Sequence, residues 1–210
     1  MPQLPESLWW DHNAHYHRWL MRQLPPRPVR VLDVGCGSGR LACAMSARAD
    51  HVDGVDRSPQ MLEQARSRCP GVVNLTWLEG DLLDRAVQLH GSGYDVITAV
   101  WRLHHMPLQP ALQRLAELLR PGGIFIVVGH YRPATAGDRA LELIRLPANA
   151  AVGAALALRG RAGKPDDEGM PVLPPSSTFV HVRAAATALL PGATVRRCLY
   201  WRFLLTWRFR

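Results

Sequence analysis

The chain has 210 residues, a length that suits one domain with a substantial core and is too short for two large ones. Its formal net charge is +8, and all but one of its 25 basic residues are arginine, a skew that a GC-rich genome produces without any nucleic-acid partner. The four cysteines form no CxxC pair and no recognisable disulfide framework, no apolar run reaches membrane-spanning length, and the N-terminus lacks a signal peptide's order of charge before apolar residues. These features argue against a disulfide-stapled secreted scaffold and a membrane-spanning protein, and they predict a cytoplasmic protein in a reducing compartment.

Residues 1–24 are crowded with aromatic and histidine side chains. They include Trp9, Trp10, Trp19, Tyr16, His12, His15 and His17. Helical spacing predicts one or two helices here, ended by Pro25 and Pro26. The histidines have no cysteine or trio of carboxylates beside them, so they do not indicate a closed metal site. We expect a cap that packs its tryptophans on a sheet or closes over a bound ligand.

An apolar, β-branched run, Val31–Val34, stops at three glycines spaced two apart, Gly35, Gly37 and Gly39. This pattern predicts a strand, a tight turn and the start of a helix, with glycines where a ligand comes close to the backbone. Nicotinamide-type fingerprints read GxGxxG, whereas here the spacing is GxGxG and Arg40 stands where the third glycine would be. The turn lies at the carboxyl end of a strand, where open α/β sheets bind ligands.

Acidic residues end or follow the next two predicted strands. Asp56 ends the strand His51–Asp56, near the roughly 20-residue interval after a glycine turn at which a carboxylate accepts hydrogen bonds from ribose hydroxyls. Ser58 and Pro59 then supply an N-cap and the first residue of a helix. Asp81 follows the predicted strand Val72–Leu78 and either caps a helix or binds a ligand.

A fourth strand is predicted at Tyr94–Trp101, and it leads directly to His104 and His105. A helix over Pro110–Arg120 follows, with apolar residues on one face. It stops at Pro121-Gly122-Gly123, which opens a fifth strand at Ile124–Gly129.

Four landmarks in this order resemble the class I S-adenosylmethionine-dependent methyltransferases: the glycine turn after Asp33, then Asp56, Asp81 and the run Leu118–Gly123. The resemblance covers about half of the chain. It implies an α/β three-layer sandwich around a mostly parallel seven-stranded sheet whose last strand is antiparallel. The chain would then be a single methyltransferase domain with an N-terminal helical cap (1–27), a donor-binding half (28–132), helices and a substrate lid (133–192) and a C-terminal β-hairpin (193–210).

The resemblance also implies S-adenosyl-L-methionine as methyl donor and S-adenosyl-L-homocysteine as product. Asp56 would bind the ribose, and Asp81 would accept from the adenine amine while Leu82 flanks the ring. The residues expected to bind the donor are Tyr16, Asp33, Gly35, Cys36, Gly37, Asp56, Arg57, Asp81, Leu82 and Val100.

His104 and His105 are the candidate general bases, because a histidine titrating near neutrality can deprotonate a phenol or an enol. The alternative is that one histidine packs in the core and the other caps the next helix. Some related quinone O-methyltransferases carry two glutamates beside a histidine in this segment and bind a divalent cation. Here Trp101 and His104 stand at the glutamate positions, so we expect no metal. Trp101, together with Trp9 and Trp10, is expected to line an apolar acceptor pocket.

The remaining sequence is less regular. Asp138–Leu158 is predicted to be a helix broken at Pro147, and Gly160–Ser177 a long loop or lid rich in proline, glycine and charge. Phe179–Leu190 is predicted to be a helix. The sequence ends in two tightly joined strands, Ala193–Trp201 and Phe203–Arg210.

We therefore expect a methyltransferase, monomeric or homodimeric, that acts at oxygen, carbon or nitrogen of an apolar or aromatic metabolite of the kind found in secondary metabolism. Two alternatives stay open. The basic, aromatic C-terminal hairpin would suit an RNA methyltransferase or an RNA-binding module. A cofactor-binding protein that transfers no methyl group, such as a regulatory subunit, would have the same donor pocket.

Overall fold

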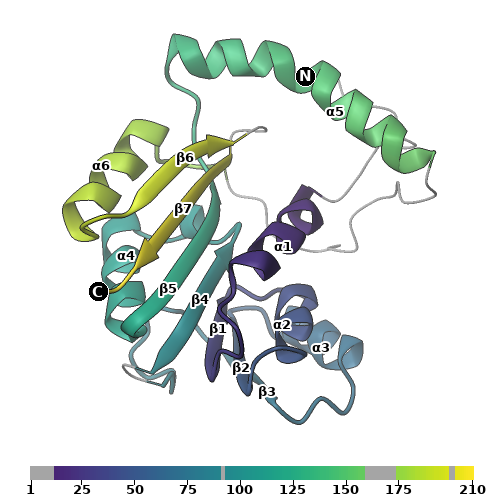
Figure 1. Ribbon diagram of the computed structural model, residues 1–210, viewed down its shortest axis with the longest axis vertical. Helices are drawn as coiled ribbons and strands as arrows, with labels where there is room; N and C mark the ends of the chain where they lie inside the picture. Colours follow the sequence, from purple (N-terminus) through teal and green to yellow (C-terminus); the bar gives the residue numbers. More distant parts are fainter. Residues whose placement is uncertain (1–11, 91–92, 159–173, 199–201) are drawn as a thin grey trace.

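The computed structural model describes residues 12–90, 93–158, 174–198 and 202–210, and its centre is a seven-stranded sheet in the order β3-β2-β1-β4-β5-β7-β6 (Figure 1). The strands are β1 (Arg30–Val34), β2 (His51–Asp56), β3 (Leu75–Glu79), β4 (Tyr94–Val100), β5 (Leu119–His130), β6 (Thr194–Cys198) and β7 (Arg202–Arg208). Strands β1 to β5 pair in parallel, and β7 pairs antiparallel with both β5 and β6. The predicted sheet, with its antiparallel last strand, is confirmed.

Helices cover both faces of this sheet (Figure 1). The described helices are α1 (His12–Gln23), α2 (Arg40–Ser46), α3 (Pro59–Arg68), the short 3₁₀ helix η2 (Leu103–His105), α4 (Leu108–Leu118), α5 (Ala136–Ala157) and α6 (Phe179–Leu189). Helices α1, α2 and α3 lie on one face and α4 and α6 on the other, whereas α5 stands away from the sheet. None of these helices is both long enough and apolar enough to cross a membrane.

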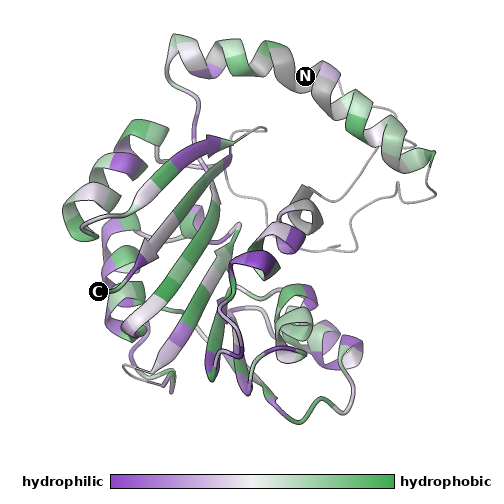
Figure 2. Cartoon of the chain, viewed as in Figure 1, coloured by the Kyte–Doolittle hydropathy of each residue, from purple (hydrophilic) through white to green (hydrophobic). Residues whose placement is uncertain are grey.

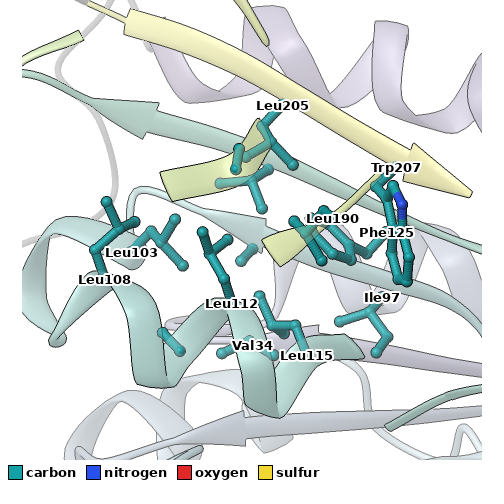
Figure 3. Close-up of a cluster of buried hydrophobic side chains, with 14 of the residues drawn as sticks. Val34, Ile97, Leu103, Leu108, Leu112, Leu115, Phe125, Leu190, Leu205 and Trp207 are labelled. Carbon is teal, nitrogen blue, oxygen red and sulfur yellow. The ribbon is translucent and has the colours of Figure 1, made fainter. Parts of the chain in front are cut away.

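Alternating side chains of the central strands build one apolar layer on each face. Leu32 and Val34 of β1 belong to the larger layer, under α4 and α6, while Val31 belongs to the layer under α1 and α2. Figure 3 shows Leu112 and Leu115 of α4 within the larger layer. The strands are correspondingly apolar along their middle (Figure 2). Fully burying one such side chain is worth about 1.5–3 kcal/mol, so the two layers fix the register of the sheet and the edge at which its parallel strands end.

Several element boundaries differ from the sequence-based expectation. Strand β3 begins at Leu75 rather than Val72. Val73 is fully exposed, and the side-chain Nδ2 of Asn74 donates to the Ser46 and Ala49 carbonyls at the end of α2. Helix α5 continues through Pro147, so the predicted break there is wrong.

The cysteines also differ from expectation. Cys43 of α2 and Cys69 at the end of α3 form a disulfide, with their Cα atoms 6.2 Å apart. These residues are 26 positions apart in the sequence, and they meet because the β1-α2-β2-α3 crossovers bring α2 and α3 to the same face of the sheet. The expectation of no disulfide framework is therefore wrong for this pair, whereas Cys36 and Cys198 are free thiols.

Asp33 lies inside the sheet rather than at its edge. Its side chain is 2% exposed and accepts a hydrogen bond from the Thr98 hydroxyl of β4 at 2.7 Å. Burial is the main cause that raises the pKa of Asp33 to about 7; the nearby Asp56 carboxylate adds to the rise, and the Thr98 hydrogen bond opposes it. The folded protein therefore holds a proton on Asp33 under mildly acidic conditions.

This raised pKa predicts a pH-dependent stability. The folded state binds more protons than the unfolded state between about pH 4 and pH 7, so the free energy of unfolding falls across this range as Asp33 becomes ionised. Asp33→Asn should remove this loss and be more stable than the wild type above pH 7 by up to about 4 kcal/mol, with little difference near pH 4. Urea unfolding at pH 4.5 and pH 8 measures the difference, and Asp50→Asn, at an exposed aspartate, is the control. An Asp33→Asn effect equal at both pH values would contradict the account.

Gly129 of β5 sits opposite Phe203 of β7, and a Cβ atom at this position would overlap the buried Phe203 ring. Gly129→Ala should lower the free energy of unfolding by about 1–3 kcal/mol through overpacking. Gly137→Ala in the first turn of α5 is the matched control, since its Cβ would meet its nearest neighbour at 3.8 Å. Chemical denaturation of both variants tests this packing, and a Gly129→Ala protein as stable as the wild type would show that Phe203 does not pack on Gly129.

Candidate active site

The turn after β1 has the conformation that its glycines allow. Gly35, Gly37 and Gly39 all have left-handed backbone angles, with φ of 68°, 52° and 78°. The amides of Gly35 and Cys36 donate to the Val55 carbonyl of β2, which ties the turn to the neighbouring strand. Helix α2 begins directly afterwards at Arg40. The turn therefore lies at the carboxyl edge of the sheet, as predicted, and the Arg102 side chain lies against Gly35.

Asp56, the last residue of β2, joins three segments of this edge. One carboxylate oxygen accepts from the Gly37 amide at 2.9 Å, and the other accepts from the Ser58 amide at 3.0 Å. The Arg102 guanidinium, from the segment after β4, donates to that second oxygen at 2.6 Å. The Asp56 carboxylate is almost fully buried, so this predicted site residue is held rigidly at the base of the glycine turn.

The other predicted donor residues near β2 and β3 have local partners. Arg57 forms an exposed ion pair with Asp81, 3.6 Å between nitrogen and oxygen. Asp81 also accepts from the Leu83 amide at 2.9 Å, which is a capping interaction within its own turn. Leu82 is buried in the larger apolar layer. Ser58 accepts from the Met61 amide and Pro59 follows it, so the predicted start of α3 is confirmed.

The thiol of Cys36 is buried beside Asp33 and Asp56. Burial raises its pKa well above the ordinary value, and the two carboxylates raise it further. Cys36 is therefore a protonated thiol that packs within the turn, not a nucleophile.

The residue directly after strand β4 has a strained backbone. Val100 is the last residue of the strand, and Trp101 follows with a φ of 61°, which is uncommon for a bulky side chain. The Trp101 amide still donates to the Val128 carbonyl of β5 at 2.8 Å. This bend ends the strand and starts the segment that carries Arg102, His104 and His105.

Aromatic and imidazole rings gather where β4, β5 and β7 meet this edge. The centroid of the Trp101 ring lies 4.1 Å from that of His130 and 6.3 Å from that of His104. The His104 ring lies 4.1 Å from His105 and 5.7 Å from His130, again between centroids. The Arg202 guanidinium lies over Trp101 at 4.6 Å and over Tyr16 of α1 at 5.8 Å. We call Tyr16, Trp101, His104, His105, His130 and Arg202 the edge cluster.

Two histidines of the edge cluster, His104 and His105, are held neutral. Burial, together with the nearby His105 and Arg102, lowers the pKa of His104 to about 4. Burial also lowers the pKa of His105, with Arg102 and Arg57 adding to the effect and Asp56 opposing it. The His104 Nδ1 atom and the Trp101 Nε1 atom are buried and have no hydrogen-bond partner among the described residues. A neutral, unpartnered imidazole nitrogen can accept a proton or a hydrogen bond from a bound molecule.

The structure thus brings together Tyr16, Trp101, His104 and His105 of the predicted site, while Asp33 and Leu82 lie within the core. Trp9 and Trp10 lie outside the described residues. Sequence reasoning assigned no role to Arg102, His130 or Arg202. His130 directly follows a predicted strand and so carried a usable signal, whereas Arg202 reaches the edge only through its pairing with His130 in the β5–β7 register.

Comparisons with known proteins agree with this architecture. Residues 31–123 match a methyltransferase domain family. The chain is 34% identical over 201 residues to an uncharacterized methyltransferase of Mycobacterium tuberculosis, which covers 95% of this chain and 96% of that protein. It is also 32% identical over 127 residues to the ubiquinone biosynthesis O-methyltransferase of Thiobacillus denitrificans, covering 55% of this chain and 54% of that enzyme.

Among solved structures, the magnesium protoporphyrin IX methyltransferase of Synechocystis PCC 6803, determined with bound S-adenosylhomocysteine, matches with a TM-score of 0.59 at 21% identity, covering 94% of this chain and 81% of that one. At this identity the likeness concerns the fold. Together with the near-full-length relative, the sheet order and the glycine turn, it shows that the chain belongs to the class I S-adenosylmethionine-dependent methyltransferases.

Proposed function

We propose that this enzyme methylates the hydroxyl group of an apolar or aromatic small molecule, with His104 as the general base. The observation that carries the proposal is the neutral His104 ring, whose buried Nδ1 atom has no partner among the described residues and which lies in a cluster of aromatic rings at the carboxyl edge of the sheet. The neighbouring glycine turn and Asp56 form the proposed donor site.

The residues at the turn fit S-adenosylmethionine. Asp56 offers a buried, rigid carboxylate for ribose hydroxyls, and the left-handed glycine turn lies directly beside it. Asp81, from the turn after β3, would accept from the adenine amine, and Arg57 would stay paired with Asp81. When bound, the donor supplies an electrophilic methyl group on a sulfonium, which an acceptor atom must approach in line.

His104 would take the proton of the acceptor hydroxyl. Because its pKa is about 4, the ring is in the basic form throughout the neutral range. Such a base is weak, so much of the acceleration would come from alignment of the acceptor, worth roughly 7–11 kcal/mol in model systems. A phenol or an enol suits this base better than an aliphatic alcohol, because its proton is more acidic.

The acceptor pocket is proposed to lie over the edge cluster. The Trp101 and His130 rings, 4.1 Å apart, offer an apolar and aromatic surface, and Tyr16 approaches from α1. The partial relative named as a ubiquinone biosynthesis O-methyltransferase supports an aromatic hydroxyl as acceptor. Trp9 and Trp10 stay within the proposal as further walls. The lid stays proposed at Gly160–Ser177, most of which lies outside the described residues.

Two observations disfavour RNA as the acceptor. Arg197 of β6 pairs with Asp138 at 3.3 Å and lies over the Phe179 ring, and Arg202 is buried over Trp101. These hairpin arginines therefore serve contacts within the protein. Turnover of a small phenol to its methyl ether would separate the proposed enzyme from a cofactor-binding protein that transfers no methyl group.

Transfer is proposed to need no divalent cation. The segment after β4 offers Trp101 and imidazole nitrogens, whereas hard cations prefer several oxygen ligands. Methyl transfer measured with excess EDTA should therefore equal the untreated rate, and addition of Mg²⁺ should not raise it. A loss of activity with EDTA that Mg²⁺ restores would overturn this part of the proposal.

Substitution of the proposed base tests the mechanism. With labelled S-adenosylmethionine and a panel of catechols, hydroxybenzoates and hydroxyquinones, His104→Gln should lower kcat/KM by about 10²–10⁴-fold and leave the donor Kd unchanged. The wild-type rate should show no acid limb from this group until the pH falls toward 4, because His104 stays deprotonated above that value. His181→Gln, at an exposed histidine of α6, is the control. An unchanged rate in His104→Gln would exclude His104 as the base.

A further inference from the structure

The side chain of Arg102 lies across the proposed donor site. Its aliphatic stem runs so close to Gly35 that a Cβ atom at that glycine would overlap it. Its guanidinium ends on Asp56, the carboxylate proposed for the ribose. The strained backbone at Trp101 precedes Arg102 and sets the direction of the segment. Arg102 thus touches two of the groups that the donor itself would touch.

Asp56 does not have enough hydrogen-bonding capacity to keep its three present partners and also bind two ribose hydroxyls. A carboxylate offers about four lone-pair sites, and three are taken here, by the amides of Gly37 and Ser58 and by Arg102. Two ribose hydroxyls need two sites. The amides belong to the glycine turn and to the start of α3, which the fold holds in place. The Arg102 side chain is the partner that can leave.

A displaced Arg102 needs another anion. Its side chain is 13% exposed in the pair and that of Asp56 is 3% exposed, so both charges are largely removed from water. Leaving a buried cation without its carboxylate strongly destabilises the folded protein unless another anion takes the place of that carboxylate. Arg57, the neighbouring cation, is exposed and already paired with Asp81. The donor itself brings one carboxylate, on its methionine moiety.

We infer that Arg102 exchanges the Asp56 carboxylate for the carboxylate of the donor when S-adenosylmethionine binds. The planar guanidinium suits two parallel hydrogen bonds to a carboxylate. Arg102 is thereby a donor-binding residue that also fills the site before the donor arrives. This inference rests on the proposed donor site at the glycine turn and Asp56.

Two ligands that differ in the amino acid part test the exchange. S-adenosylhomocysteine and 5′-methylthioadenosine share the adenosine and the thioether, and the second has no carboxylate. Calorimetric titration of Arg102→Gln should show S-adenosylhomocysteine binding weakened by about tenfold or more, an effect typical of losing a charge-assisted hydrogen-bonded pair. Binding of 5′-methylthioadenosine should be unchanged or tighter, because Asp56 is then free of its cation. Arg102→Lys, which keeps the charge, should retain part of the preference for S-adenosylhomocysteine.

Other outcomes of this titration have distinct meanings. If Arg102→Gln bound both ligands more tightly by the same factor, Arg102 would be a simple competitor of the donor and the exchange would be overturned. Unchanged binding of S-adenosylhomocysteine by Arg102→Gln would overturn the exchange as well. Arg132→Gln, at an exposed arginine just beyond β5, is the matched control and should leave both affinities unchanged. If the wild-type protein bound neither ligand, the donor site itself would fail. If it bound both with no loss in Asp56→Asn, the site would lie elsewhere.

Discussion

The carboxylate of Asp56 is the constraint on which the active edge of this protein depends. It accepts hydrogen bonds from the turn after β1, from the start of α3 and from the segment after β4, three pieces of chain that otherwise meet only at the sheet edge. Because the carboxylate is buried, each of these bonds lies away from competing water. The same group therefore organises the loop conformation of the glycine turn and offers the recognition chemistry proposed for the donor.

A second organising feature is the antiparallel return of β7 along β5. This pairing sets Arg202 opposite His130, so the first residue of the last strand lies at the edge where the parallel strands end. The Arg202 guanidinium then covers Trp101, whose left-handed backbone turns the chain out of β4 toward His104. Burial and nearby charge together keep His104 and His105 neutral, which gives this edge a basic nitrogen in an aromatic setting.

Much of the fold was predictable from local patterns. The apolar run before Gly35, the Ser58 cap and the strand ending in Asp56 each carry a backbone reason for their structure, and all three are confirmed. The donor and acceptor roles of the named residues stay predictions. Long-range features carried no such signal. The Cys43–Cys69 disulfide depends on how two crossover helices come to lie side by side. The Arg102–Asp56 pair depends on the ends of β4 and β2, which lie on either side of β1. Sequence spacing fixes neither.

The central claim is that the glycine turn and Asp56 bind the methyl donor, and calorimetric titration of S-adenosylhomocysteine tests it most directly. We expect the wild-type protein to bind with a Kd in the range of about 1–100 μM, Asp56→Ala to lose that binding, and NAD not to bind at the same concentrations. Thermal unfolding of Asp56→Ala checks that the variant is folded. Equal affinity in the wild type and a folded Asp56→Ala protein, or a preference for NAD, would contradict the account.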